Sequence, residues 1–221
     1  MSKQTEEEQK LLRKEMPEVE RLTDLIFGLA LSIGALVLIS QPPQDSVGIL
    51  ADVVIFSYSF FILVTVWTHY TVTLTYIRIE TLSILRLNFI LLFLVALEPY
   101  FFFLLTSGPK EFIGGAIDDI ASMLYAIDLA ALMAILAYFS DLVIKKEGRK
   151  IHKEEVTRHD VDRIVYYASA VMLVLSALPI FWTTNLSGYP LRYYLWIGPV
   201  VAIVMGSMIT AYQSRMRSKG S

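Results

Sequence analysis

Short polar breaks divide the chain into six apolar stretches, each long enough to cross a bilayer as a helix. Hydropathy and helix-breaking residues predict spans at about 24–40, 49–77, 84–106, 119–143, 163–184 and 193–214. A crossing needs about 20 residues. The composition agrees, because 55% of the residues are hydrophobic and only 18% are charged, against about a quarter in soluble domains. We therefore expect an all-α polytopic membrane protein with six transmembrane helices.

The charged residues indicate the domain organisation. A mixed-charge segment, residues 1–23, precedes one membrane domain, residues 24–214, and a polar tail, residues 215–221, follows it. The first segment lacks the basic-then-apolar order of a signal peptide, so we expect it to persist as a cytosolic helix. Residues 145–162 form the longest polar insertion, which we interpret as a cytosolic helical turn or hairpin. Its basic excess would face anionic headgroups, and we favour a role in orientation over lipid-specific regulation.

Lysines and arginines predict the orientation, because they concentrate in short cytosolic loops. With six spans, only Lys110 and Arg192 of the 19 lysines and arginines fall in loops on the opposite side. We therefore predict a multi-pass protein of the cell membrane with both termini in the cytosol.

Enzymatic function is not expected. The chain has no cysteine and three histidines, and it contains no phosphate-binding glycine loop, no Gly-x-Ser-x-Gly and no paired histidines at metal spacing. His152 and His159 are expected to be surface residues of the polar linker. We predict no cofactor, no resident metal ion and no nucleic-acid partner. A purely structural membrane scaffold remains an alternative, which would be distinguished by the absence of ion flux.

The first predicted helix has an asymmetric distribution of side chains. At 100° per residue, Ser32, Ile33 and Leu36 fall with Leu29 in a stripe about 100° wide. Small residues lie largely off this stripe and permit close packing against neighbouring helices; they are Gly28, Ala30, Gly34 and Ala35.

Such a stripe has a physical logic if several copies of the helix surround an axis. Branched aliphatic rings close a pore by dewetting, and hydroxyl oxygens replace part of the hydration shell of an ion. Leucine and isoleucine occur in any membrane helix, however, so periodicity alone does not establish a pore.

Sequence motifs in the first three helices resemble the transmembrane protein 175 family of potassium channels. The run from Leu22 to Ile33, which contains Thr23 and Asp24, is similar to that family's Phe-Ser-Asp start of the first helix. The second helix carries Trp67-Thr68-His69-Tyr70, similar to a tryptophan and histidine cluster. The third carries Arg86-Leu87-Asn88-Phe89, Phe93 and Pro99-Tyr100-Phe101, similar to an asparagine-led helix that ends in proline and aromatic residues.

The resemblance implies a bacterial or archaeal homotetramer of six-helix subunits that conducts potassium passively through a pore lined by the first helix. The Thr-Val-Gly-Tyr-Gly filter of ordinary potassium channels is absent. Carried over from the motif aspartate, the family's hydrophobic constriction falls on Leu29 and its selectivity layer on Ser32. Further pore-lining aliphatic residues fall on Ile33 and Leu36. The expected partners are three further copies, membrane lipids and monovalent cations, with potassium as the permeant ion.

The resemblance also implies a polar network near the cytosolic side, formed by Asp24, His69 and an arginine. The family's arginine position is Glu18 in this chain, and Arg21 is the nearest arginine. Asp24 also lies where the first span begins, so its carboxylate is equally suited to capping a helix N-terminus. For His69 we favour a structural bond to the first helix over metal binding or catalysis.

Four of the acids in or near the predicted spans are candidates for a functional role. Glu98 and Asp128 are intramembrane, so each should have a polar neighbour or contact water. In a proton-coupled secondary cation transporter, the alternative function, this pair would carry protons. Asp118 and Asp119 at the outer mouth of the fourth helix would attract cations, or would simply be a solvated helix start.

Overall fold

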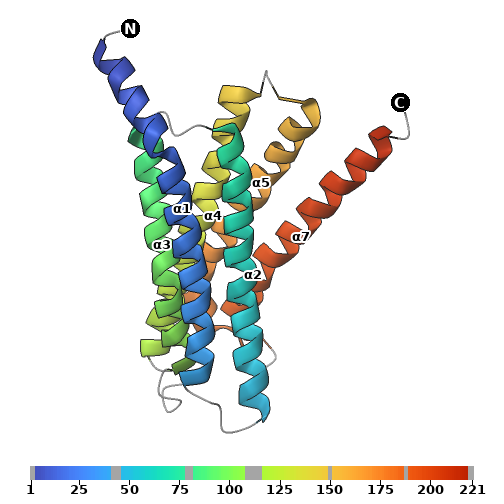
Figure 1. Cartoon of the computed structure of the whole chain (residues 1–221). Coiled ribbons are helices and arrows are strands. Elements are labelled where there is room, and N and C mark those ends of the chain that lie inside the picture. Colours follow the sequence, from blue (N-terminus) through green and yellow to red (C-terminus); the bar gives the residue numbers. More distant parts are fainter. Residues whose placement is uncertain are drawn as a thin grey trace. The chain divides into compact units, whose positions relative to one another are not determined.

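The structure is a computed structural model that describes residues 3–40, 46–77, 82–107, 116–148, 151–186 and 189–218. Within these ranges almost the whole chain is helical, which confirms the predicted all-α class (Figure 1). The long helices are α1 (Lys3–Ser40), α2 (Ser46–Tyr76), α3 (Leu82–Ser107), α4 (Ala116–Glu147), α5 (Lys153–Ser176) and α7 (Leu191–Ser218). A short helix α6 (Ile180–Thr183) and two antiparallel two-residue strands, β1 (Asn185–Leu186) and β2 (Tyr189–Pro190), connect α5 to α7.

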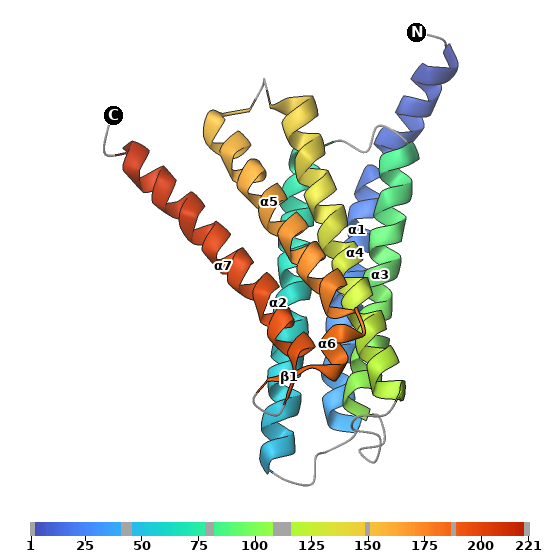
Figure 2. The same ribbon diagram turned by 180° about the vertical axis from the view of Figure 1, so that it is seen from behind.

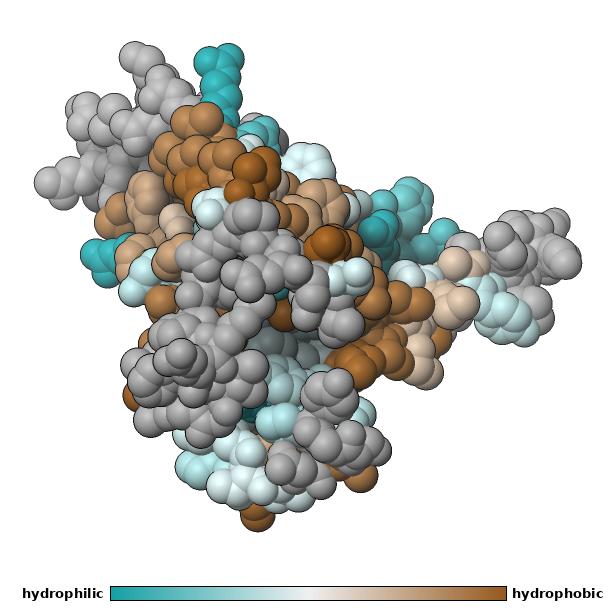
Figure 3. Space-filling model, turned by 90° about the horizontal axis from the view of Figure 1, so that it is seen from below, coloured by the Kyte–Doolittle hydropathy of each residue, from teal (hydrophilic) through white to brown (hydrophobic). Residues whose placement is uncertain are grey.

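Five helices in the described part of the chain are long and apolar enough to cross a membrane. The candidate spans are Arg21–Ser40, Asp52–Tyr76, Leu82–Leu105, Ile120–Lys146 and Leu191–Tyr212. Large hydrophobic side chains also reach the surface over much of these helices, and they form broad brown patches in Figure 3. These features are typical of a membrane protein.

The helix boundaries differ from the predictions in two places. Helix α1 already begins at Lys3, so Asp24 lies inside a continuous helix and cannot cap its N-terminus; that interpretation is wrong. The predicted fifth span, 163–184, is also wrong in its limits. Helix α5 begins within the polar linker and ends at Ser176, and Ala177 to Pro179 separate it from α6.

Local interactions explain why α5 begins early. Glu154 and Glu155 lie in its first turn, where acids favour the positive end of the helix dipole. Arg163 donates to Asp160 at 2.6 Å, one turn earlier. These interactions stabilise a continuous helix through a segment that we interpreted from the sequence as a helical turn or hairpin.

The described chain divides into two compact units, Met1–Ser107 and Gly108–Ser221. In the first unit α1 packs mainly against α3, with α2 completing a three-helix arrangement. In the second unit α5 is the central helix, with α4 and α7 packed against it (Figure 2). Each unit therefore contains three long helices, packed in different orders.

Close approach of α7 to α5 depends on glycine. A Cβ atom at Gly206 would lie 2.9 Å from Cγ2 of Val165 and 3.6 Å from Cγ1 of Val161. One at Gly198 would collide with the flexible Met172 side chain. Small residues at such points let membrane helices pack backbone to backbone.

Candidate functional site

The stripe predicted to line a pore is exposed on the first unit. Leu29 is 56% exposed, Leu36 60% and Ile33 41%, and Ser32 is exposed between them. Leu22, Leu25 and Ile39 extend the same exposed face toward both ends of the candidate span. The helix thus presents an exposed apolar face that is interrupted by the Ser32 hydroxyl.

The opposite face of α1 is buried. Its buried residues lie three or four positions apart, a spacing that places them on one face of a helix. They are Thr23, Phe27, Ala30, Gly34 and Val37. A Cβ atom at Gly34 would lie 3.5 Å from the Phe56 ring of α2. The small residues Ala30 and Gly34 therefore pack against neighbouring helices, as expected. Gly28 differs, because it is exposed with open space at its Cβ position.

The Ser32 hydroxyl has a defined orientation. Its Oγ donates to the carbonyl oxygen of Gly28, one turn earlier, at 2.7 Å. A hydroxyl carries one proton and two acceptor lone pairs. Because the proton is engaged with the backbone, Ser32 presents an acceptor oxygen to its surroundings, which suits a cation.

Hydrogen bonds join α1 to its own unit near the first turns of the candidate span. The indole Nε1 of Trp67 donates to Oδ1 of Asp24 at 3.0 Å. The Tyr70 hydroxyl lies 3.4 Å from Oγ1 of Thr23 and donates to Oδ1 of Asn88 at 2.5 Å. Side chains from α1, α2 and α3 thus form a polar network of two hydrogen-bonded groups. One is the pair of Asp24 and Trp67, and the other joins Thr23, Tyr70 and Asn88, which are each about 1% exposed.

This network differs in membership from the predicted one. The partner of Asp24 is Trp67, a residue that the sequence motifs contain but to which no role was assigned. Arg21 is exposed, and no ion pair joins it to Asp24 among the described residues. His69 is 7% exposed on α2, and its bond to the first helix stays a prediction.

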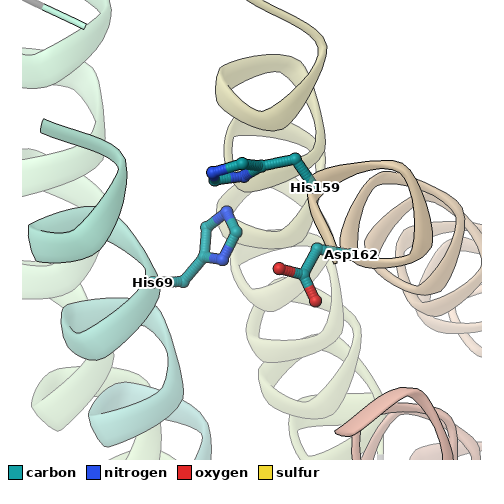
Figure 4. A group of neighbouring side chains, drawn as sticks. All are labelled: His69, His159 and Asp162. Atoms are coloured by element: carbon teal, nitrogen blue, oxygen red, sulfur yellow. The ribbon is translucent and has the colours of Figure 1, made fainter. Parts of the chain in front are cut away.

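Figure 4 labels His69 on α2 of the first unit, and His159 and Asp162 on α5 of the second. His159 and Asp162 lie one turn apart on α5. His152 is exposed, as expected, but His159 is 2% exposed, so its expected place on the surface is wrong.

The two acids that the sequence places within predicted spans are both buried. Glu98 is 1% exposed on α3 and accepts a hydrogen bond from Ser59 of α2. Asp128 is 3% exposed on α4. The expected polar neighbour is confirmed for Glu98. Asp118 and Asp119 belong to the first turn of α4, and their side chains lie outside the described residues.

Comparison of the chain with protein-family models, with curated protein sequences and with solved structures finds no match.

Proposed function

We propose that the protein is a homotetrameric, potassium-preferring cation channel whose pore is lined by α1. The observation that carries this proposal is the exposed stripe of Leu29, Ser32, Ile33 and Leu36 on a helix whose other face is packed within its unit. An apolar face with a central acceptor oxygen suits a hydrophobic constriction next to a layer that coordinates cations. The motifs that resemble the transmembrane protein 175 family support the tetramer and the preference for potassium.

The channel proposal includes six crossings, with α5 as the sixth. Near the middle of α5, Arg163 bonds Asp141 of α4 at 3.2 Å. At the C-terminal end of α5, Ser176 accepts a hydrogen bond from Trp196 of α7 at 3.0 Å, and the Trp196 ring centroid lies 5.3 Å from that of Tyr125 of α4. Helix α5 therefore runs alongside most of the α4 candidate span, which supports a crossing despite its charged first turns. Six crossings place both termini on one side, which we assign to the cytosol.

Potassium flux from liposomes tests the proposal, with the membrane potential clamped and no proton gradient imposed. We expect potassium flux that exceeds sodium flux. Leu29→Ala should raise the flux, because a shorter side chain lowers the dewetting barrier of the constriction. Ser32→Ala should lower the ratio of potassium to sodium flux while conduction persists, because it deletes a coordinating oxygen.

Leu31→Ala is the matched control. It makes the same substitution on the same helix, about 200° around the axis from Leu29, where the side chain is half-buried. Its flux should equal that of the unmodified protein. Equal potassium fluxes for Leu29→Ala, Ser32→Ala and Leu31→Ala would show that α1 does not line the pore.

The burial of Glu98 favours one second candidate, a proton-coupled secondary cation transporter. In that mechanism Glu98 and Asp128 would take up and release protons as the cation moves. Against it, the two three-helix units pack in different orders, unlike the structural repeats on which many transporters are built. Cation flux that appears only when a proton gradient is imposed, and that Glu98→Gln abolishes, would establish this candidate in place of the channel.

A further inference from the structure

A cluster of charged side chains lies on the second unit where α4 approaches its C-terminal end. Asp141 accepts from Nζ of Lys145 at 2.6 Å and from Nη1 of Arg163 at 3.2 Å. The acid is mostly covered, since its side chain is 14% exposed, whereas the Lys145 side chain is 69% exposed and that of Arg163 32%. Asp141 thus holds two cations in place, and Lys145 dominates the exposed surface.

Two exposed tyrosines lie beside this cluster. Tyr138 on α4 is 46% exposed and Tyr167 on α5 is 45% exposed. Both lie within electrostatic reach of the Lys145 ammonium group. The candidate span of α4 ends at Lys146, so the lysine lies at the depth of lipid headgroups and the tyrosines lie closer to the hydrocarbon. Amphipathic tyrosine rings favour this interfacial zone.

We propose that Lys145, Arg163, Tyr138 and Tyr167 form a binding site for one anionic phospholipid of the adjacent leaflet. The Lys145 ammonium has three donors, of which Asp141 takes one, and the others are available to a lipid phosphate. Each tyrosine hydroxyl can act as a donor, and we assign both to the glycerol ester oxygens below the phosphate. The exposed side chain of Lys146 adds a further positive charge.

Charge complementarity favours an anionic lipid over a zwitterionic one. A choline headgroup brings its own cation toward Lys145, whereas phosphatidylglycerol brings only the phosphate charge. Asp160 limits the site, because its 49% exposed carboxylate lies 2.6 Å from Arg163 and repels the phosphate. The site does not depend on the channel proposal, since all its residues belong to the second unit.

Native mass spectrometry of the purified full chain in detergent tests the site, with palmitoyl-oleoyl phosphatidylglycerol and the matching phosphatidylcholine as probes. We expect tighter binding of phosphatidylglycerol. Lys145→Gln should weaken it about fivefold, the usual effect of one cation near an anionic surface. Asp160→Asn should strengthen it. Lys153→Gln, a matched loss of one exposed positive charge, should leave it unchanged.

Three results would overturn the site. Equal binding of the two lipids would show that the site does not select a lipid by its charge. Equal weakening by Lys145→Gln and Lys153→Gln would show a diffuse positive surface that sets orientation only. Inorganic phosphate that displaces the lipid at equal concentration would indicate a site for free anions. Thermal unfolding of each variant shows whether it is folded, and the expected gain in Asp160→Asn cannot result from misfolding.

Discussion

At the scale of single residues, Tyr70 connects the three helices of the first unit. Its hydroxyl lies next to Thr23 of α1 and donates to Asn88 of α3, and all three side chains are buried. A polar group buried without a partner is costly, whereas a paired one specifies a single arrangement. Tyr70 therefore helps to fix the rotation of α1, which keeps Leu29 and Ser32 on the exposed face.

Tyr70→Phe should destabilise the protein. The change keeps the ring, whose centroid lies 6.5 Å from that of the Phe27 ring. It leaves Oδ1 of Asn88 without its hydrogen-bond donor. The expected loss is about 1–3 kcal/mol, measured as a lower thermal unfolding temperature in detergent. Tyr212→Phe is the control, because Tyr212 is 64% exposed. An unfolding temperature unchanged by Tyr70→Phe would show that this hydroxyl does not stabilise the packing of the three helices.

The sequence motifs identify the residues that belong to the polar network. They do not show which atoms of these residues form hydrogen bonds with one another. Trp67, Tyr70 and Asn88 lie in recognisable motifs, but their pairing depends on how far each helix is rotated and shifted along its neighbour. Asp24 illustrates the difficulty. A carboxylate after a polar segment indicates a helix start, yet α1 is already helical for several turns before it.

At the scale of helices, α5 and α7 depend on a glycine contact that hydropathy does not reveal. Gly206 is buried against Val165 and Val161, and valine has few alternative rotamers with which to yield. Gly198 faces Met172, whose unbranched side chain adapts more readily. The two glycines should therefore differ in their tolerance of a methyl group.

Gly206→Ala should destabilise the protein by about 1–3 kcal/mol through overpacking, and Gly198→Ala should cost less. Gly28→Ala is the control, because nothing lies within 4 Å of its Cβ position and alanine is the better helix former. Unfolding temperatures of the three variants in one detergent would check this order. A Gly206→Ala protein as stable as Gly28→Ala would contradict the close packing of α7 on α5.

Most helices were predictable from apolar runs because hydrophobic burial and bilayer crossing both require them. The exception is α5, where polar side chains such as Asp160 and Arg163 pair with one another and remain helical. Hydropathy counts such residues as loop, since it takes no account of their partners. The exposed face of α1 was correctly grouped by helical periodicity, since residues at 100° intervals share a face wherever the helix is placed.

At the scale of the whole molecule, the two units have different packing orders, and the pore of the proposed channel requires further copies of the chain. Leu29, Ser32 and Leu36 are exposed on the first unit. In a tetramer they would surround water and ions. In a monomer they would contact only lipid, so the solvent around them distinguishes the two arrangements.

A charged, membrane-impermeant thiol reagent distinguishes water from lipid around a cysteine, because it reacts with a thiolate in water and not in hydrocarbon. The chain has no cysteine, so Leu36→Cys introduces a single thiol on the stripe, and Leu31→Cys introduces one on the other side of α1. We predict that the reagent modifies Leu36→Cys and blocks its potassium flux in liposomes, while Leu31→Cys is unaffected. An unmodified Leu36→Cys protein that conducts as before would contradict a pore lined by α1.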